Sequence, residues 1–176
     1  AMLYRKIEKD IEGYLRAEDD RIMILEGARQ IGKSFIIREV GKKLYDNFIE
    51  INFAEDDEGP KIFKGIGTTE GFYFTLSSVY GEKLDRYENT LIFLDEIQHY
   101  PQYLTLLKFF REDRRFRFIA SGSLLGITLR ETTSIPVGSI IRKNMYQLDF
   151  EEFLIANGFG QEALNTLRTK LMNRES

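Results

Sequence analysis

The sequence contains no cysteine and a single histidine among its 176 residues. Without thiols the chain cannot form disulfides or use thiolate chemistry, and one histidine excludes a histidine-rich metal site. No apolar run approaches the roughly 18 residues that a membrane-spanning helix needs. The charged N-terminal stretch also lacks a signal-peptide core. We therefore expect a cytoplasmic protein that does not enter a membrane.

An excess of positive charge is missing as well. The net charge is −3 and the pI is about 5.4, so no overall basic field would attract nucleic acid. A local cluster of arginines remains, namely Arg111, Arg114, Arg115 and Arg117. Because Glu112 and Asp113 interrupt this cluster, a solvated helix end is a better interpretation than a nucleic-acid contact.

The stretch from Gly27 to Ser34 reads G-x-x-x-x-G-K-S, the pattern of a phosphate-binding loop or Walker A motif. An apolar run at 22–25 precedes it, and a stretch with helical periodicity at 35–44 follows it, which is the strand–loop–helix context that the motif requires. The glycines allow backbone N–H groups to converge on a phosphate, and the helix N-terminus adds its dipole. Lys33 is then expected to reach the phosphates of ATP or ADP, and Ser34 to bind Mg²⁺.

The predicted nucleotide contacts are consecutive in the chain. They are Gly27, Ala28, Arg29, Gln30, Ile31, Gly32, Lys33, Ser34 and Phe35. For Arg29 and Gln30, a salt bridge to a neighbouring element is as plausible as a phosphate contact. An ordinary glycine-rich turn before a helix is the alternative interpretation of the whole motif.

Apolar and alternating segments predict the strands, and helical periodicity predicts the helices. The expected strands are 21–26, 47–54, 90–96, 116–121 and 139–148. Helices are expected at 2–18, from the loop to about 45, at 101–113 and at 163–171. Residues 61–86 fit a strand or a helix, and we favour a helix because parallel strands need crossovers. The acidic run 55–60 is expected to be a solvated turn. This alternation predicts a doubly wound α/β fold with a mainly parallel sheet.

The strand at 90–96 ends in the acid pair Asp95-Glu96, which is a Walker B pattern. Ligands of such sheets bind beyond the carboxyl ends of the strands. Asp95 is expected to hold Mg²⁺ through water, opposite Ser34. Glu96 is then free to orient or deprotonate the water that attacks the γ-phosphate. A small-molecule kinase would not need that second acid, whereas a hydrolase does. The alternative is a strand-terminal acid pair that caps a turn or helix.

Four other residues near strand ends carry weaker predictions. Ser121 is our candidate for sensing the γ-phosphate and water, with Ser123 as second choice and a plain Ser-Gly turn as the alternative. Asn52 either holds Glu96 in an inactive pose or is a strand-end amide bonded to backbone. His99 is expected to be a packing or surface residue rather than a catalyst.

These motifs occur together in one order, which makes the combination specific. The segments are 27–34, 94–98, 120–126, 136–138 and 148–154. Together they resemble the AAA-superfamily P-loop ATPase domain of a large bacterial and archaeal family, whose members are usually described as ATP-binding proteins or predicted ATPases. The resemblance covers residues from about 2 to 157. Ala28 departs from the family's common proline, which is a mild change.

The resemblance implies a five-stranded sheet with the loop strand central, and ATP hydrolysis with Mg²⁺. It gives Lys33, Ser34, Asp95 and Glu96 the phosphate, metal and water roles described above. Family members usually continue into a lid and a C-terminal domain. On that basis 1–176 would be one ATPase domain, formed by an N-terminal helix at 2–18, a core at 21–157, and the start of a truncated helical part at 158–176. A protein partner or self-association through the missing region is then expected.

The leading hypothesis is a Mg²⁺-dependent ATPase that acts as a switch or motor, with Lys33, Glu96 and Ser121 as catalytic residues. An arginine finger from a neighbouring copy would raise turnover by roughly 10³–10⁵-fold, and Arg130 and Arg142 are candidates, although surface arginines are commoner. The second hypothesis is a nucleotide-binding interaction module without turnover. The third is a small-molecule phosphotransferase.

Overall fold

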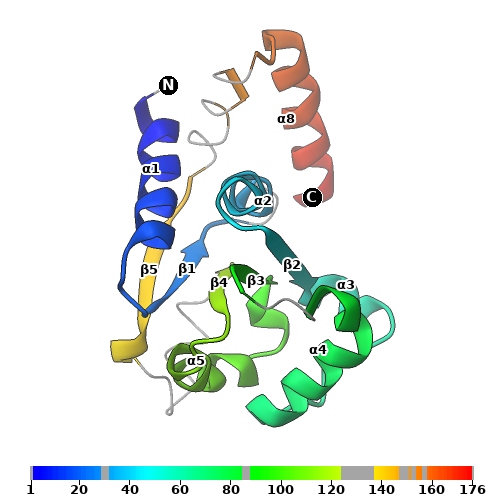
Figure 1. The fold of residues 1–176 in the computed structure, drawn as a ribbon. Coiled ribbons are helices and arrows are strands. Elements are labelled where there is room, and N and C mark those ends of the chain that lie inside the picture. The colour runs from blue at the N-terminus through cyan, green and yellow to red at the C-terminus, as the bar shows by residue number, and fades with distance from the viewer. Residues whose placement is uncertain are drawn as a thin grey trace.

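The structure is a computed structural model that describes residues 2–28, 32–84, 88–123, 137–146, 151, 154–155 and 158–175. Helices and strands alternate along most of the chain (Figure 1). In chain order the elements are α1 Met2–Arg16, β1 Ile22–Glu26, α2 Lys33–Leu44, β2 Asn47–Asn52, α3 Phe53–Glu58, α4 Thr69–Leu84, β3 Thr90–Asp95, η1 Ile97–His99, α5 Gln102–Glu112, β4 Arg117–Gly122, η2 Val137–Ser139, β5 Ile140–Asn144 and α8 Gln161–Glu175.

The five strands form one sheet in the order β2-β3-β4-β1-β5, and every neighbouring pair is parallel. This confirms the predicted doubly wound α/β class and its five strands. The expectation of a central loop strand was wrong, because β4 is the middle strand and β1 lies between β4 and β5. The chain crosses over from β3 to β4 before it adds β5. Strand β4 therefore lies between β1, the loop strand that leads into the predicted phosphate-binding loop, and β3, the acidic strand that ends at Asp95.

The interior strands β1, β3 and β4 are buried on both faces, as expected for a parallel sheet covered by crossover helices. Along β3, Leu91 and Phe93 face the cluster that contains residues of α1 and α2. Ile92 and Leu94 face the opposite cluster, which contains residues of α4 and α5. Figure 1 shows these helices on the two sides of the sheet. Because successive side chains alternate between the faces, an uninterrupted apolar run at β3 contributes to both clusters.

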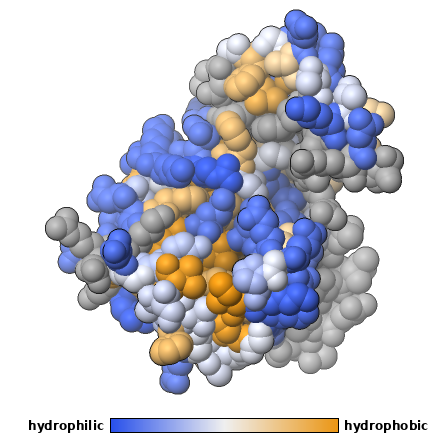
Figure 2. All heavy atoms as spheres, turned by 90° about the vertical axis from the view of Figure 1, so that its right-hand side faces the viewer, coloured by the Kyte–Doolittle hydropathy of each residue, from blue (hydrophilic) through white to orange (hydrophobic). Residues whose placement is uncertain are grey.

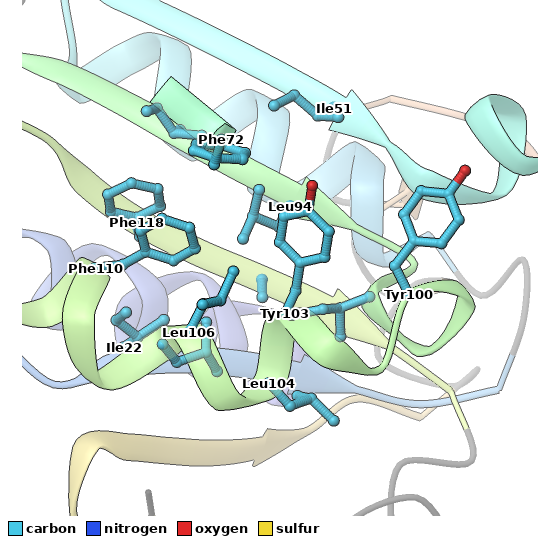
Figure 3. Close-up of a cluster of buried hydrophobic side chains, with 14 of the residues drawn as sticks. Ile22, Ile51, Phe72, Leu94, Tyr100, Tyr103, Leu104, Leu106, Phe110 and Phe118 are labelled. Carbon is cyan, nitrogen blue, oxygen red and sulfur yellow. The ribbon is translucent and has the colours of Figure 1, made fainter. Parts of the chain in front are cut away.

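Several aromatic side chains pack against one another within the cluster on the α4–α5 side of the sheet (Figure 3). Phe110 and Phe118 stack with ring centroids 4.6 Å apart, and Phe72 lies 4.9 Å from Phe110. Tyr100 and Tyr103 extend the cluster toward the carboxyl end of β3, with a centroid separation of 6.2 Å. Aromatic pairs of this kind stabilise packing beyond the area they bury. These contacts hold η1 and α5 against the sheet near the carboxyl end of β3.

The acidic run 55–60 is not the solvated turn that we predicted, and β2 ends two residues earlier than the predicted strand 47–54. Asn52 caps a short helix, α3, by accepting a hydrogen bond from the Glu55 N–H at 3.1 Å. A capping amide and acids in the first turn both favour a helix at this point. Asp56 of this helix is buried, and its carboxylate accepts hydrogen bonds from Tyr100 and from two backbone N–H groups.

Other element boundaries agree with prediction to within a few residues, with one exception. The helix expected over 61–86 is confirmed for α4, but its first part, 61–68, is not helical. The Thr68 hydroxyl accepts a hydrogen bond from the Gly71 N–H, which begins α4 there. Strand β5 is confirmed at Ile140–Asn144, and the end of its predicted range, 147–148, lies outside the described residues.

One face of the molecule, turned toward the viewer in Figure 2, shows apolar side chains surrounded by hydrophilic ones. Large exposed apolar residues of the α3–α4 part of the chain are Ile62, Phe74 and Val79, and Phe74 is 76% exposed. Single apolar side chains are normal on folded proteins. They do not by themselves indicate a binding site.

Candidate functional site

The register of the sheet brings the predicted site residues to one edge. Asn52 of β2 pairs with Asp95 of β3, and Leu94 pairs with Ala120, so Asp95 lies beside Ser121 of β4. Ser121 in turn pairs with Leu25, close to the end of β1. In parallel sheets these carboxyl ends are where ligands bind.

The loop predicted to bind phosphate connects β1 to α2. Its first residue, Gly27, donates a backbone hydrogen bond to the Gly122 carbonyl at 3.2 Å, which ties the loop to the end of β4. Gly32 precedes α2 with φ 89°, a left-handed conformation that favours glycine. Three predicted contacts, Arg29, Gln30 and Ile31, lie outside the described residues.

Lys33 is buried at the base of this loop, with 3% of its surface exposed. Its Nζ donates to the carbonyl oxygens of Gly27 at 2.7 Å and Ala28 at 2.9 Å. The same atom lies 3.9 Å from Glu96 Oε1. A buried ammonium is costly unless polar partners surround it. The Lys33 ammonium group therefore lies between the loop backbone and Glu96.

Asp95 is almost completely buried and accepts hydrogen bonds on both carboxylate oxygens. Ser34 Oγ donates to Oδ2 at 2.7 Å, and Ser121 Oγ donates to Oδ1 at 2.5 Å. Burial raises the pKa of Asp95 above its ordinary value, and the two serine hydrogen bonds act in the opposite direction. A hydroxyl oxygen and a carboxylate in contact are hard oxygen donors, which suits Mg²⁺.

Glu96 adopts a left-handed backbone conformation, with φ 57° and ψ 51°. This is uncommon for a residue with a side chain and marks a constrained position. Its N–H donates to Ser121 Oγ at 3.2 Å. Ser121 therefore contacts both members of the acid pair, since it donates to Asp95 and accepts from Glu96.

Gln98 lies two residues after Glu96 and was not among the predicted site residues. Gln98 Nε2 donates to Glu96 Oε2 at 2.5 Å and to Ser123 Oγ at 3.0 Å. Asn52, which we considered for a contact with Glu96, caps α3 instead, in agreement with its backbone-bonded alternative. The sequence shows only that Gln98 lies two residues after Glu96. The left-handed turn at Glu96 directs the Gln98 side chain back to the Glu96 carboxylate, and this turn is visible only in the structure.

The two arginine-finger candidates have different outcomes. Arg142 forms a two-pronged ion pair with Glu26, the last residue of β1, at 2.7 and 2.9 Å. Its guanidinium is thus bound within its own chain. Arg130 lies outside the described residues.

The arginine cluster lies at the opposite edge of the sheet, with Arg111 in the last turn of α5 as predicted and Arg117 in β4 rather than at a helix end. Arg111 and Arg114 both pair with Asp20. Arg115 pairs with Asp113, and the Arg117 guanidinium lies over the Tyr14 ring, 4.2 Å from its centroid. Asp20 and Asp113 therefore compensate part of the positive charge of the four arginines.

His99 is partly exposed, and its Nδ1 lies 3.5 Å from Asp57 Oδ2 of α3. This position agrees with the predicted packing or surface role. In the part of the chain that the structure describes, no helix combines the length and apolar character needed to cross a membrane. Within the same residues, no three His, Cys, Asp or Glu side chains gather into a possible metal site.

The strand order, with β4 inserted between the loop strand and the acidic strand, defines the class as a P-loop ATPase fold of the AAA type. A family model described as "AAA domain" matches residues 19–154. The chain therefore belongs to the AAA domain family, whose members are in general nucleotide-binding ATPase domains.

Among solved structures, the chain is similar to the Aeropyrum pernix ORC1 protein, whose structure was determined in complex with DNA. The TM-score is 0.52 and the sequence identity is 16%. The match covers 81% of this chain and 44% of that protein, so this chain spans less than half of that protein's length. At this identity the similarity concerns the fold alone. No match was found among curated proteins.

Proposed function

We propose that the chain binds ATP at the loop Gly27–Phe35 and hydrolyses it in a Mg²⁺-dependent reaction. One observation carries the proposal: the Ser34 hydroxyl and the Asp95 carboxylate are in direct contact, and Lys33 and Glu96 lie beside them. This reaction needs a hydroxyl and a carboxylate that bind a metal ion and a cation that contacts phosphate. It also needs a carboxylate that orients the attacking water. Membership of the AAA domain family supports the same activity.

Lys33 and the helix that follows it account for phosphate binding in this proposal. The ammonium is already directed at the loop backbone through Gly27 and Ala28, so a small rearrangement of these hydrogen bonds would present it to the β- and γ-phosphates. Helix α2 begins at the same residue, and the positive end of its dipole favours an anion there. Both features act on the same end of the nucleotide.

Ser34 and Asp95 are the proposed metal-binding residues. The hydroxyl would bind Mg²⁺ directly, and the carboxylate would hold the ion's water ligands. When bound, Mg²⁺ neutralises charge that develops on the phosphate oxygens. Ser121 keeps the Asp95 carboxylate oriented through its hydrogen bond to Oδ1.

Glu96 is the proposed residue for the attacking water. Its carboxylate would accept a hydrogen bond from that water and take its proton as the oxygen attacks the γ-phosphate. The water oxygen forms a bond to phosphorus, the bond between the γ-phosphorus and the bridging oxygen breaks, and ADP and phosphate leave. The short distance from Lys33 to Glu96 supports this role, because it places the acid next to the phosphate-binding cation.

The proposal is tested with two substitutions that separate binding from turnover. Lys33→Ala should abolish the thermal stabilisation that ATP and Mg²⁺ confer. Glu96→Gln should keep that stabilisation and lose phosphate release by roughly 10²–10⁴-fold, the usual contribution of a general base. Undiminished hydrolysis by Glu96→Gln would refute the assigned role. Binding without any turnover by the unmodified chain would instead favour a nucleotide-binding module.

The module without turnover is the second candidate, and one contact favours it. Arg142, the described candidate for an arginine finger, is paired with Glu26 of its own chain. Little or no turnover by the unmodified chain would fit this contact. We place the activity in the cytoplasm, where ATP is available, and assign no downstream target.

A further inference from the structure

Gln98 uses its whole side-chain amide to connect two segments at the edge of the sheet. The Nε2 group donates to Glu96 Oε2 at 2.5 Å and to Ser123 Oγ at 3.0 Å. The Oε1 atom accepts from the Ser123 N–H at 3.2 Å. The reverse orientation of the amide would set its oxygen against a carboxylate and its NH₂ against an N–H. The partners therefore determine the orientation of the side chain.

Ser123, the partner of Gln98 in this contact, is held in place by the end of β4. Ser123 follows β4 directly and is 3% exposed. It meets the Gln98 amide with both its hydroxyl oxygen and its backbone N–H, so Gln98 is held at two points. The position of the amide is thus set by the end of β4.

The backbone that carries Gln98 is also anchored. Its neighbour Ile97 is fully buried. Two residues further along the chain, the Tyr100 hydroxyl donates to Asp56 Oδ2 at 2.7 Å. The three-residue helix η1 is therefore fixed on both sides of Gln98, by the core and by α3.

This anchored amide constrains a carboxylate that would otherwise rotate. The hydrogen bond occupies Glu96 Oε2, and the other oxygen, Oε1, lies toward Lys33 at 3.9 Å. A carboxylate with one oxygen held keeps the second oxygen in a narrow range of directions. That direction matters because a misplacement of about 1 Å can cost roughly 100-fold in rate.

We propose that Gln98 is a positioning residue that directs the free oxygen of Glu96 toward the phosphate site, and that Ser123 acts through Gln98. The proposal rests on the proposed ATPase function. Gln98 touches neither the nucleotide nor the water in this scheme. Its effect on turnover passes entirely through Glu96.

Turnover and ATP affinity are measured separately for the intact chain and its variants. Gln98→Ala should lower kcat by roughly 10–100-fold, while the affinity for ATP changes less than about twofold. Ser123→Ala should lower kcat in the same direction by a smaller factor, because the Ser123 N–H remains. The matched control is Gln102→Ala, since Gln102 bonds the Lys64 carbonyl away from the site. An unchanged or increased kcat in Gln98→Ala overturns the proposal.

A double-mutant comparison distinguishes positioning from general structural damage. In the Glu96→Gln background, Gln98→Ala should cause no further loss of residual phosphate release, because the group that it positions is already gone. An equal loss in both backgrounds would mean that Gln98 supports the fold rather than Glu96, and this overturns the proposal. Neighbouring groups that act as a unit are expected to be non-additive in this way.

An NMR measurement tests the contact independently of turnover. The side-chain NH₂ resonances of Gln98 should be shifted from those of an exposed amide, and both Glu96→Gln and Ser123→Ala should move them. Resonances that do not respond to either substitution overturn the positioning role even if the chain hydrolyses ATP. If the resonances respond but the unmodified chain binds ATP without hydrolysing it, the proposed hydrolysis fails. The positioning role is overturned with it, whereas the contact itself is confirmed.

Discussion

Ser34 Oγ donates a 2.7 Å hydrogen bond to Asp95 Oδ2, although the two residues are 61 positions apart in the chain. The contact joins the first turn of α2 to the end of β3. It forms because the loop strand and the acidic strand are parallel and their carboxyl ends meet at one edge of the sheet. The two oxygen atoms that we assign to the metal are therefore already adjacent.

Asp95→Asn should increase the stability of the chain in the absence of Mg²⁺ and weaken the effect of Mg²⁺ on ATP binding. Burial raises the pKa of Asp95, so the folded state disfavours the charged carboxylate. The folded state then binds protons more tightly than the unfolded state, and the stability due to this group falls as pH rises above its ordinary value of 3.8. The variant's advantage in thermal melting should therefore be larger at pH 7.5 than near pH 4.

The metal side of the same variant is measured by ATP affinity with and without Mg²⁺. Loss of the carboxylate should reduce the Mg²⁺-dependent gain in ATP affinity by roughly 10–100-fold. Loss of a group that holds the ligands of a metal ion has an effect of this size. Ser34→Ala is the comparison, because it removes a metal ligand and leaves the buried charge. A Mg²⁺ effect that survives in both variants would contradict the assignment of these two residues.

Asp56→Asn should destabilise the link between α3 and η1. The Asp56 carboxylate accepts from the Tyr100 hydroxyl and from the N–H groups of Ile62 and Phe63. An amide has only one acceptor oxygen, so its NH₂ would face a donor and a buried partner would be lost. The expected cost is about 1–3 kcal/mol of unfolding free energy, measured by urea denaturation. Asp57→Asn, at a more exposed position of the same helix, should cost less than about 0.5 kcal/mol.

Tyr14→Phe tests the attachment of α1 to the sheet. The Tyr14 hydroxyl donates to the Arg21 carbonyl at 2.7 Å and accepts from the Met23 N–H at 2.9 Å. Its removal should cost about 1–3 kcal/mol in urea denaturation at neutral pH. Tyr146→Phe, at a largely exposed position, is the control and should have little effect.

The same tyrosine predicts a loss of stability in alkali. Burial raises the pKa of Tyr14 from 10.0 to about 12. The folded state holds this proton after the unfolded state has released it, so stability is full below pH 10 and falls as pH rises toward 12. Tyr14→Phe should lose less stability than the unmodified chain over this interval, by up to about 2–3 kcal/mol. A parallel loss in both proteins would show that other groups account for the alkaline effect.

The parts of the site that could be predicted are those specified by local patterns. The segment from Gly27 to Ser34 is continuous in sequence, and Asp95 follows an apolar strand, so both positions follow from strand ends alone. Their contact needs only parallel strands. The fold class was predictable for the same reason, because alternating strands and helices leave few arrangements.

The parts that could not be predicted depend on contacts between distant segments. The alternation of β2 continues through Phe53, so the pattern did not reveal that Asn52 begins a helix. The acids of α3 looked solvated because the partner of Asp56, Tyr100, lies 44 residues away. Gln98 was similarly hidden, since its role depends on the left-handed turn at Glu96 and on Ser123.

Gly41 in α2 is predicted to be essential for packing the helix of the phosphate loop onto the sheet. A Cβ at this position would lie 2.7 Å from Phe48 Cε2 and 3.0 Å from Leu91 Cδ2. Both neighbours are ring or branched side chains packed on strands β2 and β3, so one of them must move or α2 must shift. Gly41→Ala should therefore lower the unfolding free energy by about 1–3 kcal/mol, although alanine is the better helix former.

Gly13→Ala in α1 is the matched control for this effect. Gly13 is exposed, and nothing lies within 4 Å of the added Cβ, so only helix propensity changes. This variant should gain up to about 1 kcal/mol, and the two substitutions should have opposite signs in urea denaturation. A shift of α2 would also move Lys33 and Ser34, so Gly41→Ala should weaken ATP binding while Gly13→Ala should not. Equal effects of the two substitutions on stability would show that α2 does not depend on this close approach.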